Sequence, residues 1–249
     1  MPFAYSRKLT GNLRSKEGNR HLGFILAFVA GLINAGGFLA VHQYTSHMTG
    51  IVSAMADHLA LGMYGLVFAG VGALLSFLLG AASTAVMINY ARRHHQLTEF
   101  AFPLLVEAVL LLVFGLLGAQ LSTIHGFYLP ITVMLLCFIM GLQNAVITKI
   151  SKAEIRTTHI TGIITDIGIE LGKLFYWNRH KEWAEPLVDA NHDRLKVLCS
   201  LAGLFFSGGV VGALGFHYMG YLTTLPIAAV LLFLAIAPTI DAWKDWRQK

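Results

Sequence analysis

Long apolar runs separated by short polar connections make up most of this chain. Each run is close to the roughly 20 residues that an α-helix needs to cross the hydrocarbon core of a bilayer. The pattern predicts an all-α polytopic membrane protein with six transmembrane helices, at about residues 22–41, 63–90, 102–121, 127–147, 195–216 and 222–240.

The composition supports this prediction. Hydrophobic residues make up 56% of the 249 residues, and charged residues make up 12%, whereas about a quarter of the residues in an ordinary soluble domain are charged. There is too little polar surface for a water-soluble globule of this length. We expect one membrane domain at residues 21–241, between a basic N-terminal tail at 1–20 and a short C-terminal tail at 242–249.

One polar phrase occurs twice within the apolar sequence. GLINA at 31–35, followed by TSHMTGI at 45–51, returns as GLQNA at 141–145, followed by TTHITGI at 157–163. Such a duplication points to two related halves, at about residues 21–122 and 126–241. Because each half holds three predicted spans, an odd number, the second half enters the membrane from the opposite side. The repeats are therefore predicted to be inverted.

A second likeness links the two halves. Gly72 and Ser76 in the predicted second span are echoed by Gly203 and Ser207 in the fifth. Small residues one turn apart allow helices to approach closely. We expect the stripe of Gly72, Ser76, Gly80 and Thr84 to serve helix packing.

The basic residues predict the orientation. With six spans, all 18 lysine and arginine residues fall on one face of the membrane, and the positive-inside rule makes that face cytoplasmic, together with both termini. The net charge of +5 does not indicate a nucleic-acid partner, because the basic residues form no patch interleaved with aromatic residues.

The segment after each Thr-Gly pair is too short to cross the membrane as an ordinary span. We predict short helices at about residues 51–61 and 163–177, with Thr49 and Thr161 as N-caps. One interpretation makes them broken or re-entrant helices whose N-termini offer N–H groups to an anion in a cavity. The other makes them amphipathic helices at the interface, since Asp166, Glu170 and Lys173 share one face of the second helix.

Polar residues in the repeated phrases are the candidate substrate-binding residues. His47 and His159 occupy matching positions, and imidazole titrates near physiological pH, so they are either proton carriers or structural hydrogen-bonding groups. Asn34 and Asn144 either bind substrate or bridge helices. The full predicted substrate-binding set is Asn34, His47, Thr49, Gly50, Asn144, His159, Thr161, Gly162 and Asp166.

Glu107 is the only acidic residue within an uninterrupted predicted span. A charge at mid-membrane costs about 2.5–3.5 kcal/mol on insertion scales, so this side chain is expected to face a partner or a watery cavity, or to be protonated. Glu107, with His159, is our candidate for proton coupling. The alternative is that it lies near enough to the cytoplasmic end to meet Arg92 or Arg93.

Other kinds of chemistry find little support in the sequence. His42, His47 and His58 gather on the predicted outer side, but their spacing matches no established metal motif. Cys137 and Cys199 lie in apolar stretches without CxxC spacing. Because G-x-S-x-G, HExxH, P-loop and Rossmann motifs are absent, we expect no enzyme and no cofactor.

The phrases SHMTG at 46–50, GLQNA at 141–145 and RTTHITG at 156–162, followed by Thr165 and Asp166, resemble the YoaK family of bacterial multipass membrane proteins, whose domain has no known function. The resemblance covers about residues 23–237. Ile51 departs from it, because many relatives carry asparagine directly after Thr-Gly. The resemblance implies the bacterial cytoplasmic membrane and supplies no substrate.

The leading hypothesis is a secondary transporter or permease for a small polar or anionic solute, with proton coupling as a further expectation. The main alternative is a non-transporting membrane scaffold or regulatory protein, in which the polar phrases only lock the halves together. An intramembrane enzyme ranks third. The expected partners are the lipid bilayer and an unidentified solute, and homo-oligomer formation stays open.

Overall fold

The structure of this chain is a computed structural model, which describes residues 9–10, 15–93, 99–121, 128–151, 158–177 and 187–247. Most of the basic N-terminal tail, the connection between the two predicted halves and the last two residues lie outside this description. The regular structure of the described residues is helical: α2 (Lys16–Val41), α3 (Met48–Ala60), α4 (Tyr64–Arg93), α5 (Ala101–Leu121), α6 (Tyr128–Ile150), α7 (Ile160–Phe175), α8 (His192–Met219), the 3₁₀ turn η1 (Gly220–Thr223) and α9 (Thr224–Arg247).

Local capping explains where two of the long helices begin and end. Ser15 precedes α2, and its hydroxyl accepts a hydrogen bond from the Gly18 N–H. Asn191 precedes α8 and accepts from the Arg194 N–H in the same way. Both are N-cap contacts that satisfy an otherwise unpaired amide of the first turn. Residues with positive φ, His42 at 54° and Gly220 at 57°, end the two helices.

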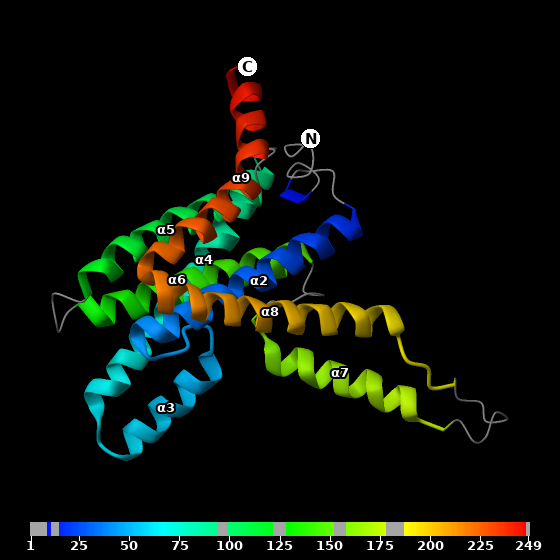
Figure 1. The fold of residues 1–249 in the computed structure, drawn as a ribbon, viewed down its shortest axis with the longest axis horizontal. Coiled ribbons are helices and arrows are strands. Elements are labelled where there is room, and N and C mark those ends of the chain that lie inside the picture. The colour runs from blue at the N-terminus through cyan, green and yellow to red at the C-terminus, as the bar shows by residue number, and fades with distance from the viewer. Residues whose placement is uncertain are drawn as a thin grey trace.

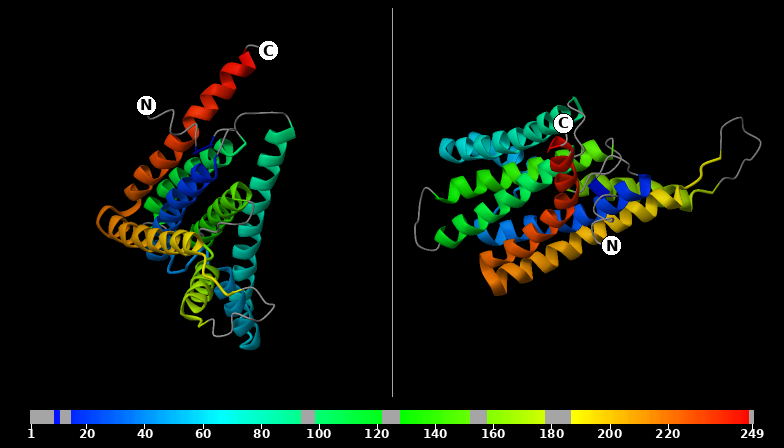
Figure 2. Two further views of the ribbon diagram at one scale, coloured as in Figure 1. Left: turned by 90° about the vertical axis from the view of Figure 1, so that its right-hand side faces the viewer. Right: turned by 90° about the horizontal axis from the view of Figure 1, so that it is seen from above.

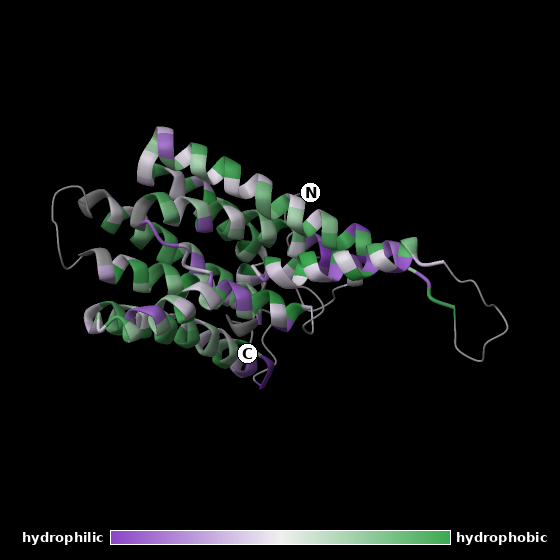
Figure 3. Cartoon of the chain, turned by 90° about the horizontal axis from the view of Figure 1, so that it is seen from below, coloured by the Kyte–Doolittle hydropathy of each residue, from purple (hydrophilic) through white to green (hydrophobic). Residues whose placement is uncertain are grey.

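Five stretches among the described residues are long and apolar enough to cross a membrane, and hydrophobic residues dominate the long helices in Figure 3. This supports a polytopic, all-helical membrane protein. The fifth stretch runs from His192 to Ile236 and includes α8, η1 and most of α9. A straight helix of its 45 residues would be roughly 67 Å long, about twice the hydrocarbon core. Our count of six crossings stays a prediction.

Each long helix has its largest interface with a helix from the other predicted half. α2 packs mainly on α8, α4 on α6, and α5 on α9. Figures 1 and 2 show these helices side by side in one bundle, from which the C-terminal end of α9 extends. The main cluster of buried hydrophobic residues draws on all six. The core therefore lies between the halves rather than within either one.

α2 and α8 are in backbone contact at two glycines. A Cβ atom at Gly31 would lie 2.1 Å from the carbonyl oxygen of Phe205, and a Cβ at Gly208 would lie 2.1 Å from that of Phe28. No side chain larger than hydrogen fits at either position without moving a helix. The pair is thus held at a distance that only glycine permits.

The same contact occurs between α4 and α6. A Cβ at Gly141 would lie 2.0 Å from the carbonyl oxygen of Phe77, and a Cβ at Gly80 would lie 2.1 Å from that of Phe138. In both helix pairs each glycine meets a phenylalanine carbonyl that lies three residues before the partner glycine. The two interfaces are therefore built from the same contacts.

These contacts revise the register of the second sequence likeness. Gly80 and Thr84 lie against α6, as the small-residue stripe predicts, and Thr84 donates a hydrogen bond to the Leu142 carbonyl at 3.1 Å. Gly203, however, has open space where a side chain would be. The glycine of α8 in the matching contact is Gly208, so the Gly-x-x-x-Ser echo does not mark equivalent packing positions.

α3 and α7 are the two short helices expected after the Thr-Gly pairs. α3 packs on α4, and α7 packs on α8. Both lie on the same side of the α2–α8 pair in Figure 1 and run from near its middle towards opposite ends. Their N-caps are His47 and His159, so the prediction that Thr49 and Thr161 cap them was wrong. Each helix begins before its threonine, because the histidine carbonyl already accepts from the amide four residues on.

Candidate functional site

Asn34 attaches the end of α2 to the loop before α3. Its side-chain oxygen accepts a hydrogen bond from the Ser46 hydroxyl at 2.8 Å and lies 3.4 Å from the Ser46 amide nitrogen, which also donates to it. The contact fixes the residue that immediately precedes the N-cap of α3. One face of this amide side chain is therefore engaged within the protein.

Asn144 makes the corresponding contact in the second half. Its side-chain oxygen accepts a short hydrogen bond from the hydroxyl of Thr158, which precedes the N-cap of α7. The two asparagines thus bridge a long helix to the loop that follows it. Their part in substrate binding stays a prediction.

The two N-cap histidines adopt nearly the same backbone conformation. φ and ψ are −94° and 69° at His47 and −86° and 57° at His159, and neither side chain caps its helix. Each ring instead lies over the glycine three residues on: a Cβ at Gly50 would be 2.2 Å from the His47 ring, and one at Gly162 would be 2.3 Å from the His159 ring. The glycine of each repeated phrase makes room for the imidazole.

A cavity of about 600 Å³ lies between α3, the start of α4, the start of α6 and the loop after α2. We call it the α3 cavity. Three histidines line it: His42, His47 and His58. Gly50 also lines it, whereas Asn34, Thr49 and the candidates of the second half do not. The structure thus brings together only two of the predicted binding residues in this cavity.

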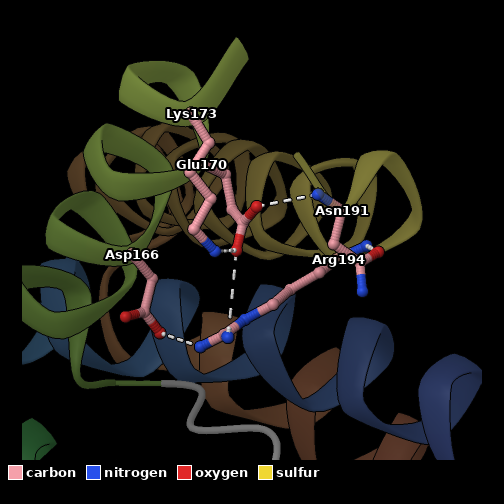
Figure 4. Close-up of polar contacts among 5 residues, drawn as sticks. All are labelled: Asp166, Glu170, Lys173, Asn191 and Arg194. Atoms are coloured by element: carbon pink, nitrogen blue, oxygen red, sulfur yellow. Dashed lines mark hydrogen bonds and ion pairs between the residues drawn. The ribbon is translucent and has the colours of Figure 1, made fainter. Parts of the chain in front are cut away.

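The acidic residues of α7 form a network with the start of α8 (Figure 4). Asp166 pairs with the Arg194 guanidinium at 3.1 Å, and the buried Glu170 pairs with Lys173 at 3.0 Å. The second oxygen of Glu170 accepts from the Asn191 N–H at 2.8 Å, and the Arg194 guanidinium lies 3.9 Å from its first oxygen. We call these five residues the α7–α8 clip.

The clip determines the charge state of Glu170. The hydrogen bond from the Asn191 N–H and the one from Lys173 hold the pKa of this carboxyl below its ordinary value, although burial opposes them. A carboxylate that accepts such bonds is favoured in its charged form. Glu170 is therefore a structural anion, and Asp166, a predicted binding residue, is already paired.

Glu107 lies in the interior of α5 with no exposed surface. Within the described part of the chain, neither of its carboxyl oxygens has a hydrogen-bond partner. Arg92 donates instead to Glu99 at 2.6 Å. The alternative in which Glu107 meets Arg92 or Arg93 was therefore wrong. Burial of a carboxyl without a partner costs free energy, which makes Glu107 a candidate for a functional role.

The sequence analysis identified the polar residues of α7 but missed the residues at the start of α8 with which they pair. Arg194 in the first turn of α8 and Asn191 just before that helix complete the clip, and the pairing of Asp166 with Arg194 spans 28 residues of sequence. A signal for Asn191 was present, because asparagine before a helical run is a common N-cap. Among the described residues, no group of three or more His, Cys, Asp or Glu side chains is placed to hold a metal ion.

Comparison with known proteins confirms the expected family. The model of a family described as "Protein of unknown function (DUF1275)" matches residues 22–237. The UPF0700 transmembrane protein YoaK of Bacillus subtilis (strain 168) is 23% identical over 214 residues, which are 84% of this chain and 90% of that protein. No solved structure matches.

Proposed function

We propose that this chain, which belongs to the DUF1275 family of YoaK-like membrane proteins, is a secondary transporter or permease for a small polar or anionic solute. The observation that carries the proposal is the pair of short helices α3 and α7. Each is held by an asparagine contact and begins at a histidine folded over glycine. Broken helices of this kind build the solute sites of many inverted-repeat transporters.

In this proposal the chain has six crossings in two inverted halves. α8 and α9 count as two crossings, because η1 separates them. The matched interfaces α2–α8 and α4–α6 support the symmetry, since the same glycine contact occurs in both. Both termini then lie in the cytoplasm of a bacterium, and α3 and α7 enter from opposite sides of its inner membrane.

Glu107 is the proposed proton-coupling group, with His159 as the second candidate. An ionised carboxylate without a partner in an apolar interior loses its hydration without compensation. A side chain in that position suits a protonation cycle that accompanies solute movement. The proposal assigns no catalytic step and no cofactor to the chain.

One set of contacts favours the alternative of a membrane scaffold or regulatory protein. One side-chain oxygen of each of Asn34, Asn144 and Asp166 already accepts a hydrogen bond from a neighbour within the chain. Polar phrases of this kind would lock the structure without binding a solute.

Flux through the purified protein in liposomes separates the two functions. Uptake of acetate, lactate, succinate and phosphate is measured with and without an imposed pH gradient. We expect flux of at least one anion, and the Glu107→Gln variant is expected to lose the stimulation by the gradient. Asp189→Asn, a change at an exposed loop residue, is the control and keeps it.

The outcomes are distinct. An unchanged response to the gradient in a folded Glu107→Gln protein would remove the proton role. Absence of flux for every anion, together with a reproducible protein partner in mild detergent, would replace the transporter by the scaffold.

A further inference from the structure

The α3 cavity is large enough for a small organic molecule. Its volume of about 600 Å³ lies within the range of about 300–1,000 Å³ that is usual for ligand pockets. Four helices and one loop contribute to its lining, so the space does not belong to a single flexible segment.

The polar part of the lining favours an anion. His42, His47 and His58 contribute imidazoles, and each imidazole carries an N–H donor in either protonation state. The first turn of α3 also reaches the cavity through Gly50, and its amides are not capped by the His47 side chain. A helix N-terminus carries partial positive charge. No carboxylate occurs among the described lining residues, so the described lining has no negative charge to balance a cation.

The rest of the lining favours an apolar body on that anion. Phe38 is stacked on Tyr44, with ring centroids 4.4 Å apart and an interplanar angle of 18°. Met55 and Met134 line the cavity from α3 and α6. Methionine side chains adapt to ligands of irregular shape. An inorganic ion would leave this apolar surface uncovered.

The second half of the chain carries charged residues at positions that correspond to part of the cavity lining. When α3 and α7 are aligned on their N-cap histidines, Ala54 and His58 of the cavity correspond to Asp166 and Glu170 of the clip. α7 thus carries its own carboxylates at this level of the helix.

The same correspondence holds for the helices on which α3 and α7 pack. When α4 and α8 are aligned on the matched contacts of Gly80 and Gly208, Leu66 of the cavity corresponds to Arg194. At the positions that correspond to Ala54, His58 and Leu66 of the cavity, the second half therefore carries the paired charges of the clip.

We infer that the α3 cavity binds a small carboxylate with an apolar body, such as an aromatic or branched aliphatic acid. The carboxylate lies towards the histidines and the first turn of α3, and the apolar body lies against Phe38 and the methionines. This inference names the class of solute for the proposed transporter. It rests on the proposed function only in assuming that the molecule bound in the cavity is also the molecule transported.

Equilibrium binding to the purified full-length protein tests the inference. The probes are phenylacetate, its neutral analogue phenylacetamide, the cation phenethylamine, and acetate, which lacks the apolar body. Titration calorimetry and the shift in Tm report binding. We expect phenylacetate to bind at least about tenfold more tightly than the other three, a difference of about 1.4 kcal/mol.

Two kinds of variant locate the site. His47→Ala and His58→Ala are expected to weaken phenylacetate binding at least severalfold, and Ala54→Phe, which fills the cavity from an exposed position, is expected to abolish it. His217→Ala is the matched control, because His217 is an exposed histidine that does not line the cavity. The Tm without ligand shows whether each variant is folded.

Each result bears on one of the two proposals. Equal binding of phenylacetate and phenylacetamide, or full binding in folded Ala54→Phe, would overturn the carboxylate site. So would a tightly held phospholipid in the cavity that phenylacetate does not displace. Binding of phenylacetate at this site without its flux through the protein in liposomes would keep the site and remove the transporter. Phenylacetate flux that Ala54→Phe leaves unchanged would do the reverse.

Discussion

At the scale of single residues, the contact of His47 with Gly50 and of His159 with Gly162 is the most distinctive local feature. Both rings lie where a β-carbon of the glycine would be. The repeated phrase therefore needs glycine for side-chain space, not for an unusual backbone, because both glycines lie within helices.

We predict that Gly50→Ala destabilises the protein by less than the roughly 1–3 kcal/mol that overpacking costs in a core, because the exposed His47 ring can rotate away. In the His47→Ala background the obstacle is gone, and the same change is expected to be neutral or to stabilise by up to about 1 kcal/mol, since alanine is the better helix former. Thermal unfolding in detergent of the four proteins of this cycle measures the coupling.

Gly168→Ala is the control for this prediction. Gly168 lies in α7 with open space around its β-position, so the substitution should not destabilise. Equal costs for Gly50→Ala with and without His47 would mean that the ring is not what the glycine accommodates.

The sequence predicted several of these residues and missed others for a physical reason. Repetition of the phrase pointed to Asn34, His47 and Gly50 and to their counterparts, because the same local structure needs the same side chains. It did not reveal Arg194, because an ion pair between two helices leaves no periodic trace in one sequence. The capping role of Thr49 was also wrong, since residue preference alone does not fix the first turn of a helix.

At the scale of elements, glycines set the closest approach of the long helices. α2 and α8 meet at Gly31 and Gly208, with a phenylalanine carbonyl opposite each. The sequence predicted close packing by small residues but not the register, because several glycines and serines of α8 are equally small. Gly203, which the sequence favoured, faces open space.

We predict that Gly31→Ala lowers stability by about 1–3 kcal/mol, because a methyl group there meets backbone that cannot rotate away. Gly203→Ala is the matched substitution in α8 and should be tolerated or slightly stabilising. The Tm of each variant in the same detergent gives the comparison. Similar losses at both positions would contradict a specific contact at Gly31.

The α7–α8 clip makes the stability of α7 sensitive to acid. Because the folded-state pKa of Glu170 lies below its value in the unfolded chain, the clip contributes its stability above the unfolded value and loses it as the pH falls through the folded pKa. We predict that the amides of α7 are less protected from hydrogen exchange at pH 3 than at pH 7, after correction for intrinsic rates. Glu170→Gln should remove most of this difference, and an equal difference in that variant would assign it to other groups.

At the scale of the whole molecule, the predicted arrangement of two inverted halves has a direct topological consequence. Leu61 follows α3 and Asp189 precedes α8, and both are exposed. The proposal places them on opposite sides of the membrane. This prediction rests on the number of spans counted in the sequence. The positions of the basic residues indicate the side of the membrane on which a loop lies, not the contacts between helices.

We predict that Leu61→Cys, in a protein with Cys137 and Cys199 replaced, reacts with an impermeant maleimide in intact cells. Asp189→Cys should react only after the cells are permeabilised, and a C-terminal tag should be protected in the same way. Labelling of both positions from one side would contradict the inverted arrangement, and an external tag would contradict six crossings.

The pairing of α2 with α8, α4 with α6 and α5 with α9 also bears on how the protein is made. Translation delivers α2 to the bilayer long before its main partner exists, so its glycine face must first be covered by lipid or by the insertion machinery. Assembly of the core therefore waits for the end of the chain. Truncation after the first three long helices would leave a product that inserts but has no partner surface, and coexpression of the two fragments would restore it.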